Sequence, residues 1–240
     1  MTQDKTAIRN AATVIVVRDR LTAPRILMGQ RGAKAAFMPN KFVFPGGAVD
    51  AEDFDIALAG SVPAPCFERL SEEQHGATLP GLADALAVAA VRELWEETGL
   101  RLGTAGRWQS AIPKDWAGFA DQGHVPNAAA LQFVFRAITP PGRPRRFDAR
   151  FFQLDAEHIQ GDIDDFSHAS DELSHLQWVP LQDAREFDLP FITEVVLAEV
   201  QAHLTTDAAP ASVPFFKNTD EAGLFKRLYG RSLTKHEMGG

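Results

Sequence analysis

The segment Leu82–Gly99, LADALAVAAVRELWEETG, limits the possible folds of this chain more than any other part of the sequence. Its middle, Ala85–Val91, is apolar around the whole circumference of a helix. A surface helix of a soluble protein usually has a single apolar face, so an all-round apolar helix is predicted to lie buried between other layers. Gly99 is the residue type that commonly ends a helix in the left-handed conformation. The sequence therefore predicts a long buried helix that stops near Gly99.

Short apolar runs on both sides of this helix predict a β-sheet. Ala11–Arg18 is rich in β-branched residues, which is typical of a central strand. Lys41–Phe44 is stopped by Pro45-Gly46-Gly47, a strong turn signal. The other predicted elements are strands at Arg25–Gln30, Leu131–Ile138, Phe147–Leu154 and Leu176–Val179, a helix at Pro190–Leu204, and a short helical stretch at Glu221–Tyr229.

The pattern predicts one α/β domain over residues 1–240. Residues 51–81 are mixed in character and contain several prolines, with a helical piece at Phe67–Gln74, and we interpret them as an insertion. Residues 181–240 are predicted to form a helical C-terminal extension. No repeat, low-complexity segment or linker divides the chain, so a single domain fits better than two.

Charge and cysteine content exclude several classes of function. The net charge of −8 argues against broad electrostatic binding to nucleic acid or to an anionic membrane. A single cysteine, Cys66, permits neither an intramolecular disulfide nor a thiolate zinc cluster. No stretch approaches the ~18 consecutive apolar residues of a membrane span, and the first ten residues lack the apolar run of a signal peptide. The expectation is a cytoplasmic protein.

Three acidic residues lie in the last turns of the predicted buried helix. Glu93, Glu96 and Glu97 have the spacing i, i+3, i+4, which places their side chains on one helix face. The helix dipole disfavours each negative charge at this end by ~0.3–1 kcal/mol. A multivalent cation would make the cluster favourable, because Mg²⁺ and Mn²⁺ prefer hard oxygen ligands. The alternative is a solvated acidic helix end, partly offset by an ion pair between Arg92 and Glu96.

The turn after the third strand favours the metal interpretation. Phe44-Pro45-Gly46-Gly47 ends a strand in backbone that has free carbonyls and no side chains in the way. Such a turn can bring a carbonyl oxygen to a metal and let a phosphate approach closely.

These two features together resemble the Nudix hydrolase family. Arg92–Leu100 matches every fixed position of the second half of the Nudix box, R-E-U-x-E-E-x-G-U with U apolar, and Gly46-Gly47 matches its opening. The first glutamate of the box falls on Asp53, and about 31 extra residues split the box, which a surface loop tolerates because its closure entropy grows slowly with length. The resemblance implies an α/β/α sandwich with a mixed β-sheet and a helical insertion. It leaves Asp53 doubtful as a functional equivalent of the glutamate.

The resemblance also implies an activity and a set of site residues. Nudix hydrolases cleave a phosphoanhydride in a nucleoside diphosphate linked to another group, so the expected cofactor is Mg²⁺ or Mn²⁺ and the expected partner is a small nucleotide-type substrate. Glu93 and Glu97 would be the principal metal ligands, and Glu96 would support them or hold a further ion. A backbone carbonyl of Gly46 or Gly47 would complete the site. Arg92 would orient the glutamates by charge-assisted hydrogen bonds.

Two further matches favour coenzyme A or its acyl derivatives as the substrate without deciding it. Arg145–Phe152, and Asp171-Glu172-Leu173 ahead of Trp178-Val179-Pro180, look like the subfamily related to animal peroxisomal coenzyme A diphosphatases. In another coenzyme A-cleaving branch a signature precedes the glycine turn. Arg31 and Phe44 fall at its spacing and are candidates for substrate binding, whereas Ala36 and Asn40 depart from it.

The remaining candidates lie between residues 146 and 175. Glu172 is the leading candidate for the general base, and Asp164, Asp165 and Asp171 are alternatives; a solvated loop acid is the other interpretation of Glu172. Arg146 and Arg150 could grip phosphates, or could belong to a surface ladder of ion pairs. Irregular spacing without cysteine partners indicates polar loop residues rather than metal ligands at three histidines, His158, His168 and His175.

A second class of function stays open at this point. Asp53 and the insertion would also suit a Nudix-fold module that binds a nucleotide-type ligand without cleaving it. The intact Glu93, Glu96 and Glu97 oppose this alternative, because a pure binder gains little from three crowded acids. The sequence also leaves open whether the chain forms a homodimer.

Overall fold

The computed structural model describes residues 7–33, 35, 38–74, 78–206, 208–218 and 223–230. Ala36, one of the departures named above, lies outside the described residues. The strands are β1 Ile8–Arg18, β2 Arg25–Arg31, β3 Phe42–Val43, β4 Gly46–Ala48, β5 Gly103–Ala105, β6 His124–Pro126, β7 Gln132–Ile138, β8 Arg146–Asp155, β9 Leu173–Pro180, β10 Val213–Asn218 and β11 Gly223–Leu228. The helices are α1 Ala64–Leu70, α2 Leu82–Thr98, α3 Ala117–Asp121 and α4 Phe191–His203, with short 3₁₀ turns η1 Ala51–Phe54, η2 Lys114–Trp116, η3 Ala156–His158 and η4 Ala184–Glu186.

Most of these strands form one mixed sheet in the described part of the chain. Its order is β11-β10-β7-β8-β1-β2-β3, with β4 paired to β1 and β9 paired to β2. The long central pair, β1 and β8, is parallel, and β1 is antiparallel to both β2 and β4. The mixed sheet that the family resemblance implied is confirmed.

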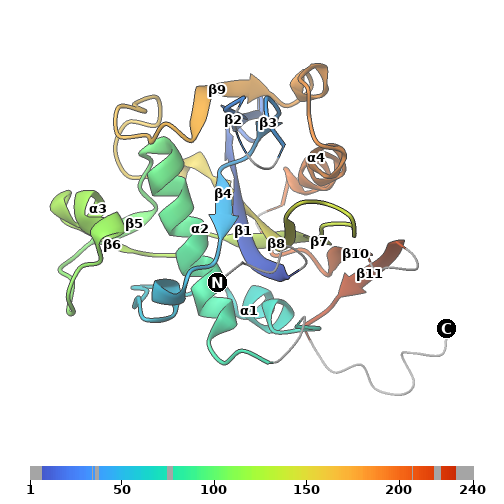
Figure 1. The fold of residues 1–240 in the computed structure, drawn as a ribbon. Coiled ribbons are helices and arrows are strands. Elements are labelled where there is room, and N and C mark those ends of the chain that lie inside the picture. The colour runs from blue at the N-terminus through green and yellow to red at the C-terminus, as the bar shows by residue number, and fades with distance from the viewer. Residues whose placement is uncertain are drawn as a thin grey trace.

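Helices cover the two faces of this sheet (Figure 1). On one face, α2 packs with Val14 and Val16 of β1 in the larger hydrophobic core. On the other face, α4 packs with Ile15 and Val17 of the same strand in a second core. Successive residues of a strand point to opposite faces, so the unbroken apolar run of β1 supplies both cores. The α/β/α sandwich is therefore confirmed.

Helix α2 has the burial and the boundaries that the sequence predicted. Every residue from Ala85 to Trp95 is buried, including Arg92 and Glu93. Gly99 caps the helix in the left-handed conformation with φ 76°, and its N–H donates to the carbonyl oxygen of Trp95 at 2.7 Å. The acidic last turn is thus held in the interior, between the sheet and the elements β5, β6 and α3 that flank α2 on its other side (Figure 1).

The glycine segment after Phe44 is a strand rather than a free turn. Gly46–Ala48 forms β4 and pairs antiparallel with Ala11, Ala12 and Thr13 of β1. The turn prediction was wrong here because glycine, having no side chain, can also lie flat against a neighbouring strand. Gly46 adopts φ 158°, and a Cβ atom on it would stand 2.6 Å from the Cα of Thr13. A side chain is therefore not tolerated at this position.

The prediction of a helical stretch at Glu221–Tyr229 was wrong. Gly223–Leu228 forms β11, which pairs antiparallel with β10 at the edge of the sheet. Within the described residues of the predicted helical C-terminal extension, the α-helix is α4 and the part after it forms β10 and β11. An edge position needs one apolar face rather than a full apolar alternation, and Phe225 fills that role against the aromatic rings of Phe135 and Phe216.

Residues 51–81, which the sequence analysis interprets as an insertion, are bound to this C-terminal hairpin. The Glu73 carboxylate accepts hydrogen bonds from Lys217 Nζ of β10 at 3.2 Å and from Lys226 Nζ of β11 at 2.8 Å. Arg69 Nη2 donates to the carbonyl oxygen of Ala211 at 3.1 Å, and the N–H of Gly230 donates to Glu72 Oε2 at 3.0 Å. Two segments far apart in the sequence therefore stabilise each other.

Among the described helices, none has both the length and the apolar character needed to cross a membrane. The single-domain organisation, the cytoplasmic location and the homodimer stay predictions.

Candidate functional site

Two of the three acidic side chains lie directly on the glycine strand. Glu97 Oε2 accepts a hydrogen bond from the N–H of Gly46 at 2.7 Å. The Glu93 carboxylate occupies the space in which a side chain at Gly47 would stand. Glu93 and Glu97 are both buried, whereas the Glu96 side chain is 30% exposed. The structure therefore brings the acidic helix end and the glycine segment together, as the sequence predicted.

Arg92 holds two of these acids in place. Its Nη1 donates to Glu93 Oε1 at 2.8 Å and to Glu96 Oε2 at 3.2 Å. Its Nη2 donates to the carbonyl oxygen of Ala48, at the end of β4, at 2.9 Å. A guanidinium is planar and carries five N–H donors, so a single arginine can tie the helix, its carboxylates and the glycine strand together.

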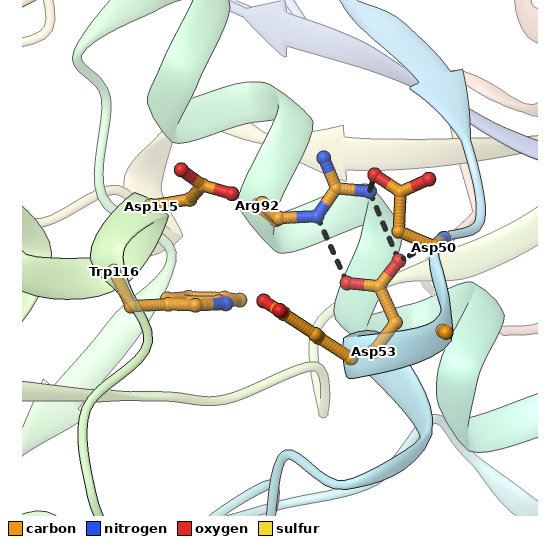
Figure 2. Close-up of a pocket in the computed structure, with 7 residues that line it drawn as sticks. Asp50, Asp53, Arg92, Asp115 and Trp116 are labelled. Atoms are coloured by element: carbon orange, nitrogen blue, oxygen red, sulfur yellow. Dashed lines mark hydrogen bonds and ion pairs between the residues drawn. The ribbon is translucent and has the colours of Figure 1, made fainter.

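Asp53 stands where the Nudix box has its first glutamate, and it binds the Nε and Nη2 edge of Arg92. Its two carboxylate oxygens accept from Arg92 Nε at 2.8 Å and from Arg92 Nη2 at 2.9 Å, a bidentate pair that is almost completely buried (Figure 2). Asp53 Oδ2 also accepts from the N–H of Asp50 at 2.8 Å, which fixes η1. The shorter aspartate thus reaches the box arginine even though the box is split by the insertion.

Burial makes the negative charges of this site costly. Desolvation, with the neighbouring charge of Glu93, raises the pKa of Glu97 to about 8. Desolvation also raises the pKa of Glu93 to about 7, although Arg92 opposes the change. Burial lowers the pKa of Arg92, but its hydrogen bond to Asp53 and the charge of Glu93 raise the pKa more, so it stays a cation. One arginine does not neutralise the three acids that it binds, Asp53, Glu93 and Glu96.

This donor set fits a divalent cation. Carboxylate oxygens in excess of the available positive charge, next to backbone with no Cβ atoms, suit a small hard ion. Within the described ranges no three acidic, histidine or cysteine side chains converge as a ready-made ligand cluster. The reason is visible in the hydrogen bonds, since Arg92 and Gly46 direct the carboxylates toward themselves.

Glu172 and Arg31 lie near the carboxylates from the side of β2 and β9. The charge of Glu172 contributes to the raised pKa of Glu93, Glu96 and Glu97. The charge of Arg31 has the opposite effect and lowers the pKa of Glu97. Glu172 is exposed and directly precedes β9. The N–H of Ser170 donates to the carbonyl oxygen of Glu96 at 2.8 Å, which ties the loop before Glu172 to α2.

The other candidate acids and histidines of this region lie around that loop. Asp164 forms an exposed ion pair with Arg18 at 2.8 Å, and Asp165 caps its own turn by accepting from the N–H of Ser167. His168 stacks on Trp95 with ring centroids 5.6 Å apart. Asp171, His158 and His175 are exposed. The prediction of loop positions was wrong for two of the histidines, since His158 ends η3 and His175 lies in β9.

Three of the predicted substrate-binding residues are not brought to the carboxylates. Arg150 is fully buried and pairs with Asp148, Nη1 to Oδ2, at 3.2 Å, so its prediction as a phosphate ligand was wrong. Phe44 is 4% exposed and packs in the core beneath α4. Arg146 donates to the carbonyl oxygen of Thr139 at 3.0 Å, where β7 connects to β8. The sequence of β8 does not record which of its faces is covered, because that depends on the elements that pack against it.

A cavity beside Arg92 was not predicted from the sequence. It has a volume of about 250 Å³ and lies between η1, η2 and α2 (Figure 2). Two of its lining residues, Asp115 and Trp116, come from the loop-rich region after the box. No local sequence signal connects them with Arg92, because only the tertiary fold brings η2 beside η1. The other lining residues are Asp50, Ala51, Glu52, Asp53 and Arg92.

Comparisons with known proteins agree with this site. No family model matches the chain. Nudix hydrolase 7 of Caenorhabditis elegans is 30% identical over 183 residues, which make up 71% of this chain and 51% of that protein. The acyl-coenzyme A diphosphatase NUDT19 of Gallus gallus is 29% identical over 179 residues, covering 53% of this chain and 47% of that protein. The chain thus spans about half the length of the curated relatives it matches.

A solved structure agrees over nearly its whole length. The crystal structure of a Nudix hydrolase from Alicyclobacillus acidocaldarius superposes with a TM-score of 0.61 at 25% identity, covering 84% of this chain and 97% of the other. The sequence relatives, this structural match, and the box residues gathered at the glycine strand lead to one conclusion. The chain belongs to the Nudix hydrolase family.

Proposed function

We propose that this protein hydrolyses a phosphoanhydride bond in a nucleoside-diphosphate-linked substrate, with a divalent cation as cofactor. The observation that carries the proposal is the contact of Glu93 and Glu97 with the glycine strand, together with their burial. Buried carboxylates without enough positive charge around them are unfavourable unless a cation pairs with them.

In this proposal Glu93 and Glu97 hold the cation, Glu96 supports them, and a carbonyl of Gly46 or Gly47 completes the donor set. When bound, Mg²⁺ or Mn²⁺ would neutralise the diphosphate and make a water molecule more acidic. The chain's own contribution is to keep the carboxylates in place. Arg92 does so through its hydrogen bonds to Glu93 and Glu96, and Asp53 in turn fixes Arg92.

Glu172 is proposed as the residue that accepts the proton. The attacking water forms a new bond to phosphorus, the bridging oxygen leaves with the electron pair of the broken P–O bond, and the proton of the water passes to Glu172. Its support is electrostatic proximity to Glu93, Glu96 and Glu97 and the hydrogen bond that anchors its loop to α2. Asp171, its exposed neighbour, is the alternative.

Coenzyme A or an acyl derivative is the favoured substrate. This choice is supported by the acyl-coenzyme A diphosphatase among the relatives, and Arg31 is the proposed phosphate contact near Glu97. The choice is tested with a panel of coenzyme A, acyl-coenzyme A, ADP-ribose, NADH, dinucleoside polyphosphates and nucleoside triphosphates, each with and without Mg²⁺ or Mn²⁺. Preferential cleavage of another member would contradict the choice of coenzyme A.

Glu97→Gln tests the activity itself. We expect turnover to fall by at least ~100-fold, since the change removes a metal ligand, while the circular dichroism spectrum is retained. Glu194→Gln is the matched control, because Glu194 is an exposed glutamate on α4, on the far face of the sheet. Unchanged turnover in Glu97→Gln, with normal behaviour of the control, would remove the assignment of Glu97 to the metal.

A second candidate function is a Nudix-fold module that binds a nucleotide without cleaving it. It is favoured by one observation, the absence of a converged ligand cluster in the described ranges. The same panel distinguishes the two candidates. Binding of a member by calorimetry without cleavage of any member in either metal would favour the module.

A further inference from the structure

The cavity beside Arg92 has a composition that the proposed chemistry does not use. It lies next to the carboxylates, because Arg92 lines it and Nη1 of the same residue binds Glu93 and Glu96. Asp115, on the opposite wall, is close enough to Glu96 to contribute to the raised pKa of that residue. A group bound in the cavity would therefore be a neighbour of the proposed reaction centre.

Trp116 presents an unused hydrogen-bond donor to this cavity. Its side chain is 1% exposed and packs between the rings of Trp108 and Phe119. Among the described residues its indole N–H has no hydrogen-bond partner, and the nitrogen-bearing edge of the ring points toward the space between η1 and Arg92 (Figure 2). The indole nitrogen borders the cavity and is not fully enclosed, so this N–H can donate to a group bound there.

The acids that surround the indole limit the ligand further. Asp50, Glu52 and Asp115 are exposed around the opening, and Asp53 is already occupied by Arg92. Arg9 and Arg92 approach Asp50 at 3.3 and 3.8 Å, but no comparable ion pair joins Glu52 or Asp115 to another described residue. The negative field disfavours a phosphate group here. The indole N–H is itself a hydrogen-bond donor, so a bare cation offers it no partner.

We infer that the cavity binds an uncharged part of the substrate that both donates and accepts hydrogen bonds, a hydroxyl or an amide. Its acceptor atom would meet the indole N–H of Trp116, and its donor would meet a carboxylate of Asp115 or Glu52. The inference rests on the proposed function, since a nucleotide substrate carries such groups beside its diphosphate. Two sources have this chemistry, the hydroxyls of a ribose and the hydroxyl and amide groups of pantetheine.

The test follows the indole N–H signals of the full-length, ¹⁵N-labelled protein by NMR during titration with uncharged probes. Adenosine represents the ribose and pantetheine the amide-bearing chain. The Trp116 signal is assigned with Trp116→Phe. The Trp108 signal is the internal control, because Trp108 Nε1 already donates to the carbonyl oxygen of His124 at 2.9 Å. We expect one of the two probes to shift the Trp116 signal and to leave the Trp108 signal in place.

Asp115→Asn provides the second readout and does not depend on a buried substitution. We expect it to weaken binding of the active probe about 5-fold, the effect of one hydrogen bond to a charged acceptor. Asp121→Asn, an exposed aspartate at the end of α3 that does not line the cavity, should leave binding unchanged.

Three results would overturn the inference: no shift of the Trp116 signal with either probe, a shift caused by inorganic phosphate, or a shift caused by Mg²⁺ alone. Its failure is distinguishable from failure of the proposed function. The probes contain no phosphoanhydride, so their binding is measured separately from the turnover that Glu97→Gln tests.

Discussion

Two clusters of buried charged side chains lie on the face of the sheet that α2 covers, and their net charges have opposite signs. In the site cluster, one arginine, Arg92, binds three acids, Asp53, Glu93 and Glu96. In the core cluster, Asp148 binds two arginines, Arg136 at 2.7 Å and Arg150 at 3.2 Å. Because alternate residues of a strand share a face, Asp148 and Arg150 face the same side as Phe152, which packs in the core with α2.

The two clusters differ in the groups that surround their charged side chains. Protein groups complete most of the core cluster: Arg136 donates to the carbonyl oxygens of Glu72 and Glu73 just after α1, at 2.9 and 2.8 Å, and Arg150 donates to Asn10 at 2.6 Å. Burial nevertheless lowers the pKa of Arg150 to about 9. The site cluster borders a cavity and the two glycines of β4. We interpret unbalanced negative charge beside a cavity as a place for a ligand. The unbalanced positive charge in the core is carried by residues that are almost completely buried, and we interpret its ion pairs as stabilising the fold.

The largest expected effect comes from breaking the core cluster. Asp148→Asn leaves two buried arginines without a counter-charge, so we expect the free energy of unfolding to fall by about 3–5 kcal/mol. Urea denaturation measures it. The control is Asp164→Asn, which breaks the exposed pair with Arg18 and should cost less than about 1 kcal/mol. Equal effects of the two substitutions would contradict a structural role for the core cluster.

The matching change in the site cluster should reduce catalysis more than stability. Asp53→Asn removes the charge that fixes Arg92, and we expect kcat to fall about 10–100-fold with a smaller change in KM. Steady-state kinetics on the best substrate of the panel measures this, with Asp55→Asn, an exposed neighbour, as the control. A loss of folding with unchanged kcat in the remaining folded protein would make Asp53 part of the scaffold alone.

Cation binding should stabilise the site cluster in a pH-dependent way. The pKa values of about 7 for Glu93 and about 8 for Glu97 lie above the ordinary 4.5, so the folded, metal-free protein holds more protons than the unfolded chain in this window. Its stability therefore falls as the pH rises from about 4.5 to about 8. Mg²⁺ competes with those protons, so we expect it to raise the Tm more at pH 8 than at pH 5, by about 2–4 °C for each kcal/mol of binding.

Differential scanning calorimetry at the two pH values checks this expectation. The Glu97→Gln variant should lose most of the effect of Mg²⁺ at pH 8. The same increase in Tm at both pH values would contradict cation binding at these carboxylates.

The smallest expected effect concerns the contact between the insertion and the C-terminal hairpin. Hydrogen bonds from Lys226 and Lys217 lower the pKa of Glu73, so its stabilising contribution is present at neutral pH and is lost as the pH falls through the folded pKa. Glu73→Gln should cost less than about 1 kcal/mol at pH 7, because the pair is partly exposed, and the cost should vanish in acid. A cost that does not change with pH would contradict the ion pairs.

The sequence predicted the parts of the molecule that depend on local patterns. The long apolar segment that ends at Gly99 predicted α2, the β-branched run predicted β1, and the spacing of Glu93, Glu96 and Glu97 predicted their shared face. Two errors arose where one pattern fits two structures. Glycines at Gly46-Gly47 suit a turn or a flat strand, and the short stretch at Gly223–Leu228 suits a helix or an edge strand.

What the sequence alone determined is the set of acidic residues at the end of α2, because they sit close together on one helix and local geometry fixes their mutual positions. Only the tertiary structure decided which charges face a ligand. Arg150 and Arg92 are both buried arginines that pair with acids, yet Arg150 is enclosed by Asn10 and Asp148, while Arg92 borders a cavity shared with Asp115 and Trp116. That difference depends on contacts between segments far apart in the chain, and no local pattern records them.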